Sequence, residues 1–230
     1  MKNNRQLAIA GFLAACAAAP SMAQQNTFKL GISNVQPHSS ASDVSGPFTP
    51  GGISLEVRNQ STPFISYTRE ISNQWDVELA LGIPPRHDIV LEVNNTALPG
   101  SAQALSGQVG ATVRQVAPTV FVNYKFLEKT SPLRPFVGAG INYTRFDNTH
   151  STAAGDVLNG GPSSISLEDS VGLALQAGVG WQLSDEWSVS ASLATARVKS
   201  KITTNTLGIE RHADITFKPQ VFTVAMGYSF

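Results

Sequence analysis

The side chains that most suggest chemistry in this sequence are its four histidines, His38, His87, His150 and His212. None lies at a metal-ligand spacing from another histidine or from a cluster of carboxylates and cysteines. His87 precedes Asp88 and His150 precedes Ser151, but a catalytic dyad depends on geometry in space and not on adjacency in the chain. We therefore interpret the histidines as solvated loop residues and predict no catalytic residue, no metal and no cofactor.

A second group of ionisable side chains lies in segments that alternate between apolar and polar residues. Asp76 and Glu78 belong to the alternating segment 75–83, and Lys125 and Arg134 hold equivalent positions in two later segments. Alternation predicts strands whose polar side chains share one face, and in a small barrel that face fills the interior. We interpret Glu78, Lys125 and Arg134 mainly as a structural network that closes one end of such an interior. A part in a channel is the alternative.

Small side chains on the same inward face would leave a pocket beyond this network. Ala80 and Gly82 follow Glu78 on its strand, and Ala194 and Ala196 occupy inward positions later in the chain. The side chains predicted to line the lumen are Phe64, Glu78, Ala80, Gly82 and Ala194.

Residues 1–23 have the layout of a secretory signal peptide. A short basic start precedes an apolar, Ala-rich run, and Ser-Met-Ala at 21–23 forms a small-x-small cleavage site. The mature domain is therefore predicted to span residues 24–230. An alternative is lipidation at Cys16, the only cysteine, because the residues before it match a lipoprotein cleavage box.

The composition excludes several classes of protein. Charged residues make up 14% of the chain, whereas about 25% is typical of soluble domains. Beyond the predicted signal there is no run of about 18 apolar residues, so transmembrane helices are not expected. Removal of Lys2 and Arg5 leaves 14 basic against 16 acidic residues, which excludes nucleic acid as a partner. A membrane β-barrel, in which every second residue is apolar, fits these features.

Eight segments alternate strongly enough to be predicted as strands. Each has one apolar face with aromatic residues near its ends, which is typical of the interfacial girdle of a membrane barrel. A soluble β-sandwich also alternates, but these runs are long and their apolar faces are complete. The predicted strands are 28–33, 63–68, 75–83, 118–126, 133–143, 171–183, 187–193 and 224–230.

The connections between these segments alternate in length. The short ones are 72–74, 128–132 and 184–186, and the long ones are 38–60, 84–111, 147–167 and 199–214. This arrangement is typical of outer-membrane barrels, which have short periplasmic turns and long extracellular loops. We predict an all-β fold, an eight-stranded antiparallel transmembrane β-barrel with both termini on the periplasmic side.

The C-terminal segment carries an assembly signal on its lipid-facing side. Tyr228 and Phe230 alternate with Gly227 and Ser229, so the aromatic residues face one way and the small or polar ones the other. An aromatic last residue is what such barrels present to the barrel assembly machinery. We therefore expect that machinery as a partner.

Three prolines lie beside predicted strands three and four. Pro84 and Pro85 follow the third strand, and Pro118 begins the fourth. Because proline has no N–H for a strand ladder, it can leave a weak seam in a barrel wall. We predict a lateral opening at Pro84, Pro85 and Pro118. The alternative is that these prolines only end strands at the rim.

Several motifs resemble those of the outer-membrane protein W (OmpW) family, including its alkane-uptake branch AlkL. The segment 134–144 is similar to the family's fifth-strand motif, and 85–87 is similar to a proline-aromatic-Arg-His segment. Residues 117–119, 176–180 and 227–230 also fit. The resemblance covers essentially the whole mature chain. It implies an eight-stranded barrel with a narrow hydrophobic lumen that takes small apolar molecules from outside and releases them sideways. The family often has a large aromatic residue near Ala194, and this chain departs from it.

Three functions follow from this reading. The leading one is an outer-membrane channel for passive uptake of small hydrophobic molecules, with lateral release into the outer leaflet. The second is a non-transporting barrel whose loops serve adhesion, phage or bacteriocin binding, or envelope stability. The third is a lipid-modifying enzyme, for which no convincing nucleophile and base are present. The expected surroundings are the bacterial outer membrane, its lipid and lipopolysaccharide, and small apolar solutes.

Overall fold

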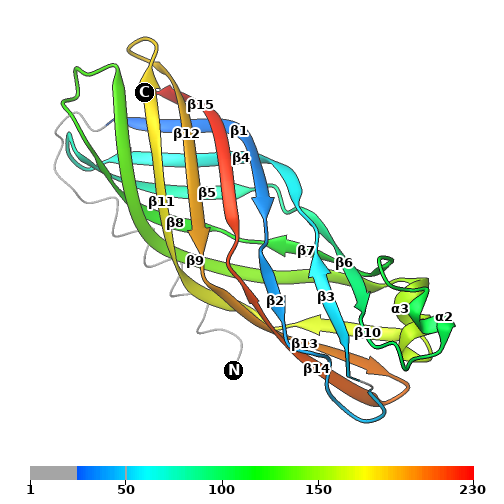
Figure 1. Ribbon diagram of the computed structural model, residues 1–230. Helices are drawn as coiled ribbons and strands as arrows, with labels where there is room; N and C mark the ends of the chain where they lie inside the picture. Colours follow the sequence, from blue (N-terminus) through cyan, green and yellow to red (C-terminus); the bar gives the residue numbers. More distant parts are fainter. Residues whose placement is uncertain (1–24, 50) are drawn as a thin grey trace.

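The computed structural model describes residues 25–49 and 51–230. Within these residues, eight antiparallel strands pair in a closed ring (Figure 1), so the predicted eight-stranded barrel is confirmed. The predicted signal peptide and Cys16 lie outside the described residues. In ring order the barrel strands are β1 (Asn26–Gln36), β4 (Gln60–Glu70), β5 (Trp75–Gly82), β8 (Thr119–Lys125), β9 (Leu133–Ser151), β11 (Ser170–Gln182), β12 (Trp187–Ala196) and β15 (Gln220–Ser229).

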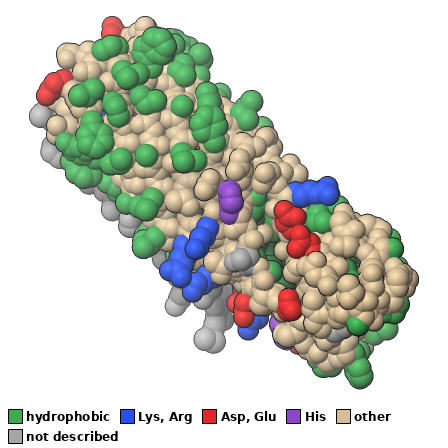
Figure 2. Space-filling view, in the orientation of Figure 1, with side chains coloured by type: hydrophobic (Ala, Val, Ile, Leu, Met, Phe, Trp, Pro, Cys, Tyr) green, Lys and Arg blue, Asp and Glu red, His purple; other side chains and the backbone are tan. Residues whose placement is uncertain are grey.

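The outer wall of this barrel is apolar because alternate side chains on each strand point outward. Leu30 is 64% exposed and Leu173 is 77% exposed, and side chains of the same kind cover that end of the molecule in Figure 2. On β9 the apolar outward residues run from Leu133 to Tyr143. Ten residue steps of ~3.3 Å on a strand tilted by ~40° span ~25 Å, the usual height of the apolar band of a membrane barrel. We name this surface the apolar band.

Aromatic side chains ring the end of the apolar band that carries the short turns. Trp75 packs on Tyr124 with ring centroids 5.0 Å apart, and Trp187 packs on Tyr228 at 5.1 Å. Phe230 stacks on Phe28 at 5.8 Å, beside the paired N- and C-terminal strands. This aromatic girdle marks the boundary between lipid and the periplasmic side.

The long connections lie together at the opposite end, as predicted, and they carry strands and short helices of their own. They extend the barrel at the end opposite to the short turns (Figure 1). No helix in the described part of the chain is long and apolar enough to cross a membrane. The elements of this extension are β2 (Ser39–Ala41), β3 (Ile53–Val57), β6 (Arg86–Val93), α2 (Gly100–Gln103), β7 (Val109–Val116), α3 (Ala153–Asn159), β10 (Ser163–Leu167), β13 (Val198–Thr206) and β14 (Ile209–Phe217).

The extension reverses the polarity of the strands. On β9 the outward side chains up to Tyr143 are apolar, whereas Arg145 faces outward beyond it and Phe146 turns inward to pack on Phe217 at 5.9 Å. An apolar interior with a polar surface is the arrangement of a water-soluble sheet. The buried residues of this extracellular core are Val57, Ile89, Ala111, Val113, Val198, Ile202, Ala213, Ile215 and Phe217.

Candidate functional site

A layer of polar side chains fills the barrel near its periplasmic end. Glu78 is 4% exposed and accepts a hydrogen bond from Lys29 Nζ at 2.9 Å. Its carboxylate also accepts bonds from Ser66 Oγ at 2.7 Å, Gln176 Nε2 at 3.1 Å and Asn123 Nδ2 at 3.2 Å. Strand alternation turns all five side chains inward, where each needs a polar partner because it is removed from water.

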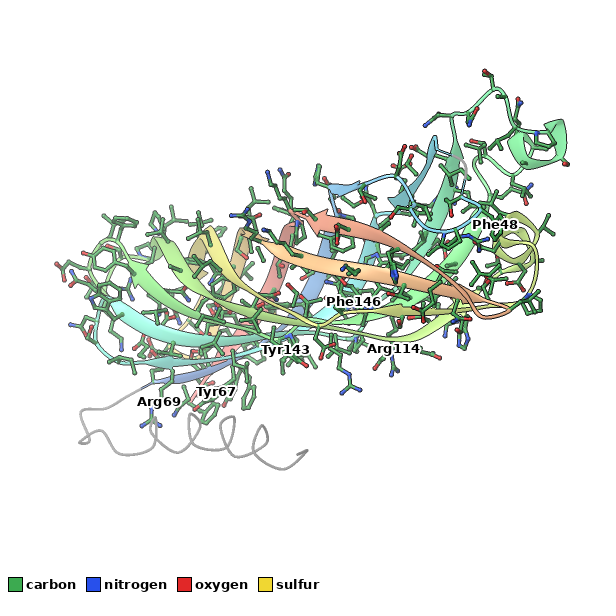
Figure 3. The ribbon with its side chains drawn as sticks, turned by 90° about the horizontal axis from the view of Figure 1, so that it is seen from below. Phe48, Tyr67, Arg69, Arg114, Tyr143 and Phe146 are labelled. Atoms are coloured by element: carbon green, nitrogen blue, oxygen red, sulfur yellow. The ribbon has the colours of Figure 1, made fainter. Side chains whose placement is uncertain are left out.

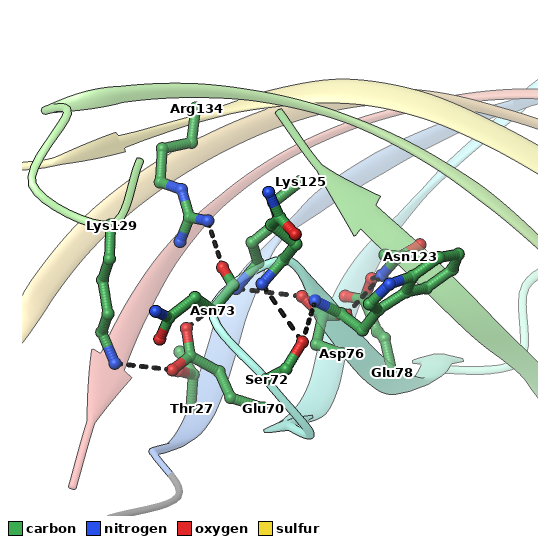
Figure 4. A network of polar contacts seen from close by, with 12 residues as sticks. Thr27, Glu70, Ser72, Asn73, Asp76, Glu78, Asn123, Lys125, Lys129 and Arg134 are labelled. Carbon is green, nitrogen blue, oxygen red and sulfur yellow. Dashed lines mark hydrogen bonds and ion pairs between the residues drawn. The ribbon is translucent and has the colours of Figure 1, made fainter. Parts of the chain in front are cut away.

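A second layer lies between Glu78 and the short turns (Figure 4). Lys125 Nζ lies 3.0 Å from Asp76 Oδ2 and 3.1 Å from Glu70 Oε1, and Lys129 Nζ lies 2.8 Å from Glu70 Oε2. Arg134 donates a hydrogen bond to the backbone carbonyl of Asn73, in the first short turn. Together the two layers form the polar network, which separates the lumen from a hollow of about 830 Å³ at the periplasmic mouth.

The polar network contains the predicted ionisable residues and several that sequence reasoning missed. Lys125 pairs with Asp76 and Glu70, and the partner of Glu78 is Lys29. Lys29 lies on the inward face of β1. Its alternation with the apolar residues Phe28 and Leu30 could have predicted that orientation from the sequence. The identity of its partner was not readable, because it depends on the register between β1, β4 and β5.

A cavity of about 140 Å³ lies in the lumen above Glu78. The structure places every residue of the predicted lumen set, Phe64, Glu78, Ala80, Gly82 and Ala194, on its wall. Phe121, Phe136, Val221 and Ala174 add apolar surface, whereas Ser190, Ser192, Thr223 and Asn142 add hydroxyl and amide groups. A site of this kind suits a small, largely apolar ligand.

The extracellular core limits this cavity on the side away from the periplasm. Val198 lines the cavity and is also a member of that core, with 1% of its surface exposed. Phe146 packs on the core from β9, and Figure 3 labels it on the extracellular side of Tyr143. The lumen is therefore bounded by charge at one end and by packed apolar side chains at the other.

The barrel wall is weakly joined beside this cavity. The ladder between β5 and β8 ends at Ala80, and the ladder between β6 and β7 begins at Arg86. Residues 81–85 and 115–118 face each other between these ladders, and we name this stretch the seam. In the described residues, one backbone hydrogen bond crosses it, from Gln115 N–H to the carbonyl of Pro85 at 3.1 Å.

Apart from that bond, the polar groups of Ala117 at the seam find partners on their own side of the wall. The carbonyl of Ala117 accepts from Asn142 Nδ2 at 3.5 Å and from Thr119 Oγ1 at 3.4 Å, within its own side of the wall. Pro84 and Pro85 have no N–H to offer. Leu81, Gly82, Pro85, Gln115 and Ala117 line the lumen cavity as well as the seam, so the cavity reaches the wall here.

Pro118 contributes to the seam in a way that only the structure reveals. Its carbonyl accepts from Tyr143 N–H on β9 at 3.0 Å. In an antiparallel ladder the N–H and carbonyl of one residue point to the same neighbour, so the N–H that Pro118 lacks would face β9. Pro118 therefore ends the regular ladder of β8 without itself facing β5 across the seam.

The prediction of solvated loop histidines is wrong for His87, and His150 and the half-buried His212 lie on β9 and β14 instead of in loops. His38 and His150 are exposed, but His87 lies on β6 with its side chain inward and 1% exposed. Its Nδ1 lies 3.1 Å from the carbonyl of Arg58, and burial lowers its pKa below the usual range. The strand alternation within the extension, which the sequence reading treated as loop, explains the difference. In the described residues, no group of His, Cys, Asp or Glu side chains could hold a metal ion.

Comparison with known proteins matches the described chain from end to end. The OmpW family model matches residues 24–230. Outer membrane protein W of Vibrio cholerae is 31% identical over 221 residues, covering 95% of each chain. The dibenzothiophene metabolism operon protein PahQ of Pseudomonas aeruginosa is 27% identical over 219 residues, covering 94% of each chain.

Two solved structures share the fold. The outer membrane protein OprG from Pseudomonas aeruginosa superimposes with a TM-score of 0.78 at 23% identity, covering 90% of this chain and 96% of its own. The outer membrane protein AlkL superimposes with a TM-score of 0.63 at 16% identity, covering 93% and 94%. At these identities the likeness concerns the architecture, which is the extended eight-stranded barrel described above.

Proposed function

This chain belongs to the OmpW family and is an outer-membrane β-barrel, and on that premise we propose that it is a passive channel for small hydrophobic molecules. In this proposal an apolar solute taken up from outside the cell occupies the lumen cavity and leaves sideways into the outer leaflet. The proposal includes no catalytic step.

The observation that carries the proposal is the continuity between the lumen cavity and the seam. Residues that border the cavity on the inside also form the weakly joined part of the wall. One of them, Leu81, points outward and is 40% exposed on the apolar band. An opening of the seam would therefore connect a largely apolar cavity directly with lipid.

The axial direction is less suited to an apolar solute. Passage to the periplasm requires crossing the polar network, where Glu78, Lys29, Asn123 and Gln176 satisfy one another. Breaking such hydrogen bonds without replacing them costs about 1–3 kcal/mol for each buried group. At the seam few backbone bonds need to part, and the solute moves from one apolar surface to another.

The names of relatives support a hydrophobic solute. PahQ and DoxH, each 27% identical to this chain over 219 residues, are named after dibenzothiophene metabolism operons. Dibenzothiophene is an apolar aromatic molecule. The operon names describe those two relatives and not this chain. For this chain we propose the chemical class, a small uncharged hydrocarbon or aromatic molecule.

A cross-link across the seam tests the proposal. Gly82 and Ala117 face each other there, and a Cβ at Gly82 would meet only Thr62 Cγ2, at 3.5 Å, so cysteine fits. We expect that Gly82→Cys/Ala117→Cys, bridged by a short thiol-specific cross-linker, reduces uptake of a radiolabelled alkane by intact cells to the level of cells without the protein. A reducible linker should restore uptake when it is cleaved.

The matched control is Ala194→Cys/Val221→Cys. These residues also line the cavity and face each other, but across the intact ladder between β12 and β15. Its cross-link should leave most uptake in place. Uptake at the wild-type rate through a bridged seam would overturn lateral release. Equal loss in both pairs would favour obstruction of the cavity, and no protein-dependent uptake at all would favour a non-transporting barrel that acts through its extracellular end.

A further inference from the structure

Three cations lie on the outer surface of the barrel, just beyond the extracellular edge of the apolar band. Arg197, Lys199 and Lys218 are all exposed, and we name them the cationic patch. Figure 2 shows Lys and Arg side chains at the edge of the apolar surface on the face it presents. The patch forms where β12 passes into β13 and β14 passes into β15.

The strand register brings these charges close together. Thr195 faces Gln220 in the pair of β12 and β15, and Val198 faces Phe217 in the pair of β13 and β14. The same register therefore sets Arg197 opposite Lys218. Lys199 follows two residues along β13 on the same face. Directly opposed side chains in an antiparallel pair lie ~5 Å apart at Cβ, and like charges there repel.

The three cations of the patch form no ion pair within the described part of the chain. The next cation along β13, Lys201, does face an acid, Asp214. Between β12 and β15 and between β13 and β14, the outward neighbours of the patch are the neutral residues Thr195, Thr216 and Gln220. On the other side of β13, Glu168 and Asp169 are exposed, but neither forms an ion pair with the patch, and Asp169 accepts a hydrogen bond from Tyr143. An external anion is thus the partner that the patch lacks.

The height of the patch above the aromatic girdle identifies the kind of anion. Arg197 lies ten residues beyond Trp187 on one strand, and Lys218 lies ten residues before Tyr228 on the other. This again corresponds to ~25 Å along the barrel, the full height of the apolar band. The patch therefore stands at the level of the lipid headgroups of the outer leaflet.

The wall directly beneath the patch is suited to acyl chains. Leu193 and Phe222 are each 52% exposed, and Leu173 is 77% exposed. We propose that the cationic patch binds a phosphate group of lipid A, the phosphorylated glycolipid anchor of lipopolysaccharide, whose acyl chains lie on this apolar wall. Arginine offers a planar fork of donors to phosphate oxygens, and the two lysines add charge on either side.

The experiment measures binding of hexa-acylated, bisphosphorylated lipid A to the folded full-length protein by native mass spectrometry in a zwitterionic detergent. The triple variant Arg197→Gln/Lys199→Gln/Lys218→Gln should bind at least about ten-fold more weakly than wild type, since it loses three charge-assisted contacts. Dephosphorylated lipid A should bind wild type as weakly as the intact lipid binds the variant. Millimolar inorganic phosphate should not compete, because it lacks the acyl chains.

A charge-matched control separates the patch from the general charge of the extension. Arg58→Gln/Arg86→Gln/Arg145→Gln removes three other exposed cations, and it should keep near wild-type affinity. Heat-modifiable migration on gels confirms that both variants are folded barrels. Wild-type affinity in the patch variant, equal loss in the control variant, or tight binding of dephosphorylated lipid A would each overturn the proposal.

Discussion

The polar network predicts a large and specific loss of stability when Glu78 is neutralised. In Glu78→Gln the side chain keeps its size, but Lys29 Nζ loses the carboxylate that lies 2.9 Å away. Lys29 is 16% exposed at its side chain and borders the hollow at the periplasmic mouth, so water can offset only part of the loss of the carboxylate. Removing one partner of such a buried pair costs about 3–5 kcal/mol, which we expect for the free energy of unfolding.

The same network contains a control at its outer edge. Lys129 also pairs with a carboxylate, that of Glu70 at 2.8 Å, but its side chain is 44% exposed. Solvent screens this pair, so Lys129→Met should lower the free energy of unfolding by no more than about 1 kcal/mol. The difference between the two variants isolates the effect of burial from that of pairing.

Urea titration of the barrel in lipid vesicles at neutral pH measures both effects. The double variant Lys29→Met/Glu78→Gln should be less destabilised than the sum of its single variants, by about 1–3 kcal/mol, because it removes both charges together. If Glu78→Gln costs no more than Lys129→Met, the pair does not hold the network together. If the loss of stability in the double variant equals the sum of the losses in the two single variants, Lys29 and Glu78 act independently.

Three further results are expected. In intact cells, Ser101→Cys should react with an external thiol reagent and Asn73→Cys should not, because α2 and the first short turn lie at opposite ends of the barrel; the reverse pattern contradicts the topology. Phe230→Ser should lower the folded fraction on heat-modifiability gels far more than Ser229→Ala, and equal fractions count against a terminal aromatic assembly signal. Burial lowers the pKa of His87 in the folded state. As pH falls, this histidine is therefore protonated in the unfolded chain before it is protonated in the folded one. The extension should lose stability below about pH 6.5. Hydrogen exchange in β6 should then accelerate, after correction for intrinsic rates, and His87→Gln should remove that acceleration.

The barrel itself could be predicted because a lipid-facing strand has a simple rule. Every outward residue is apolar, so alternation such as that from Trp75 to Leu81 locates a strand and also its two faces. The predicted strand starts and ends differ from the observed ones by a few residues, for example 63–68 against Gln60–Glu70 for β4. The residues omitted there lie near the strand ends, where serine, threonine and arginine replace apolar side chains.

The strands of the extension were missed because their apolar side chains face inward and their polar ones outward, the reverse of the barrel strands. We call this reversal of the alternation a change of phase. In β13, Val198 and Ile202 face inward while Lys199 and Lys201 face outward. Judged as lipid-facing strands such segments look polar, and judged by composition they look like loops. A search for alternation of either phase would have detected β13 and β14, whose inward residues Ala213, Ile215 and Phe217 recur at every second position.

The phase reversal also explains why a lateral route is the one worth testing. Where the strands reverse polarity, apolar side chains leave the outer wall and fill the interior, so the extracellular core occupies the axis of the barrel just above the lumen cavity. The polar network occupies the axis below. At the same level the ladder between β5 and β8 stops at Ala80, and Pro84 and Pro85, which follow β5, have no N–H with which to continue regular pairing. The seam therefore accompanies the reversal, and it lies at the height where the cavity has its apolar lining. Removal of a single proline would not separate the position of the cavity from that of the seam. That requires a variant in which the reversal lies at a different height along the strands.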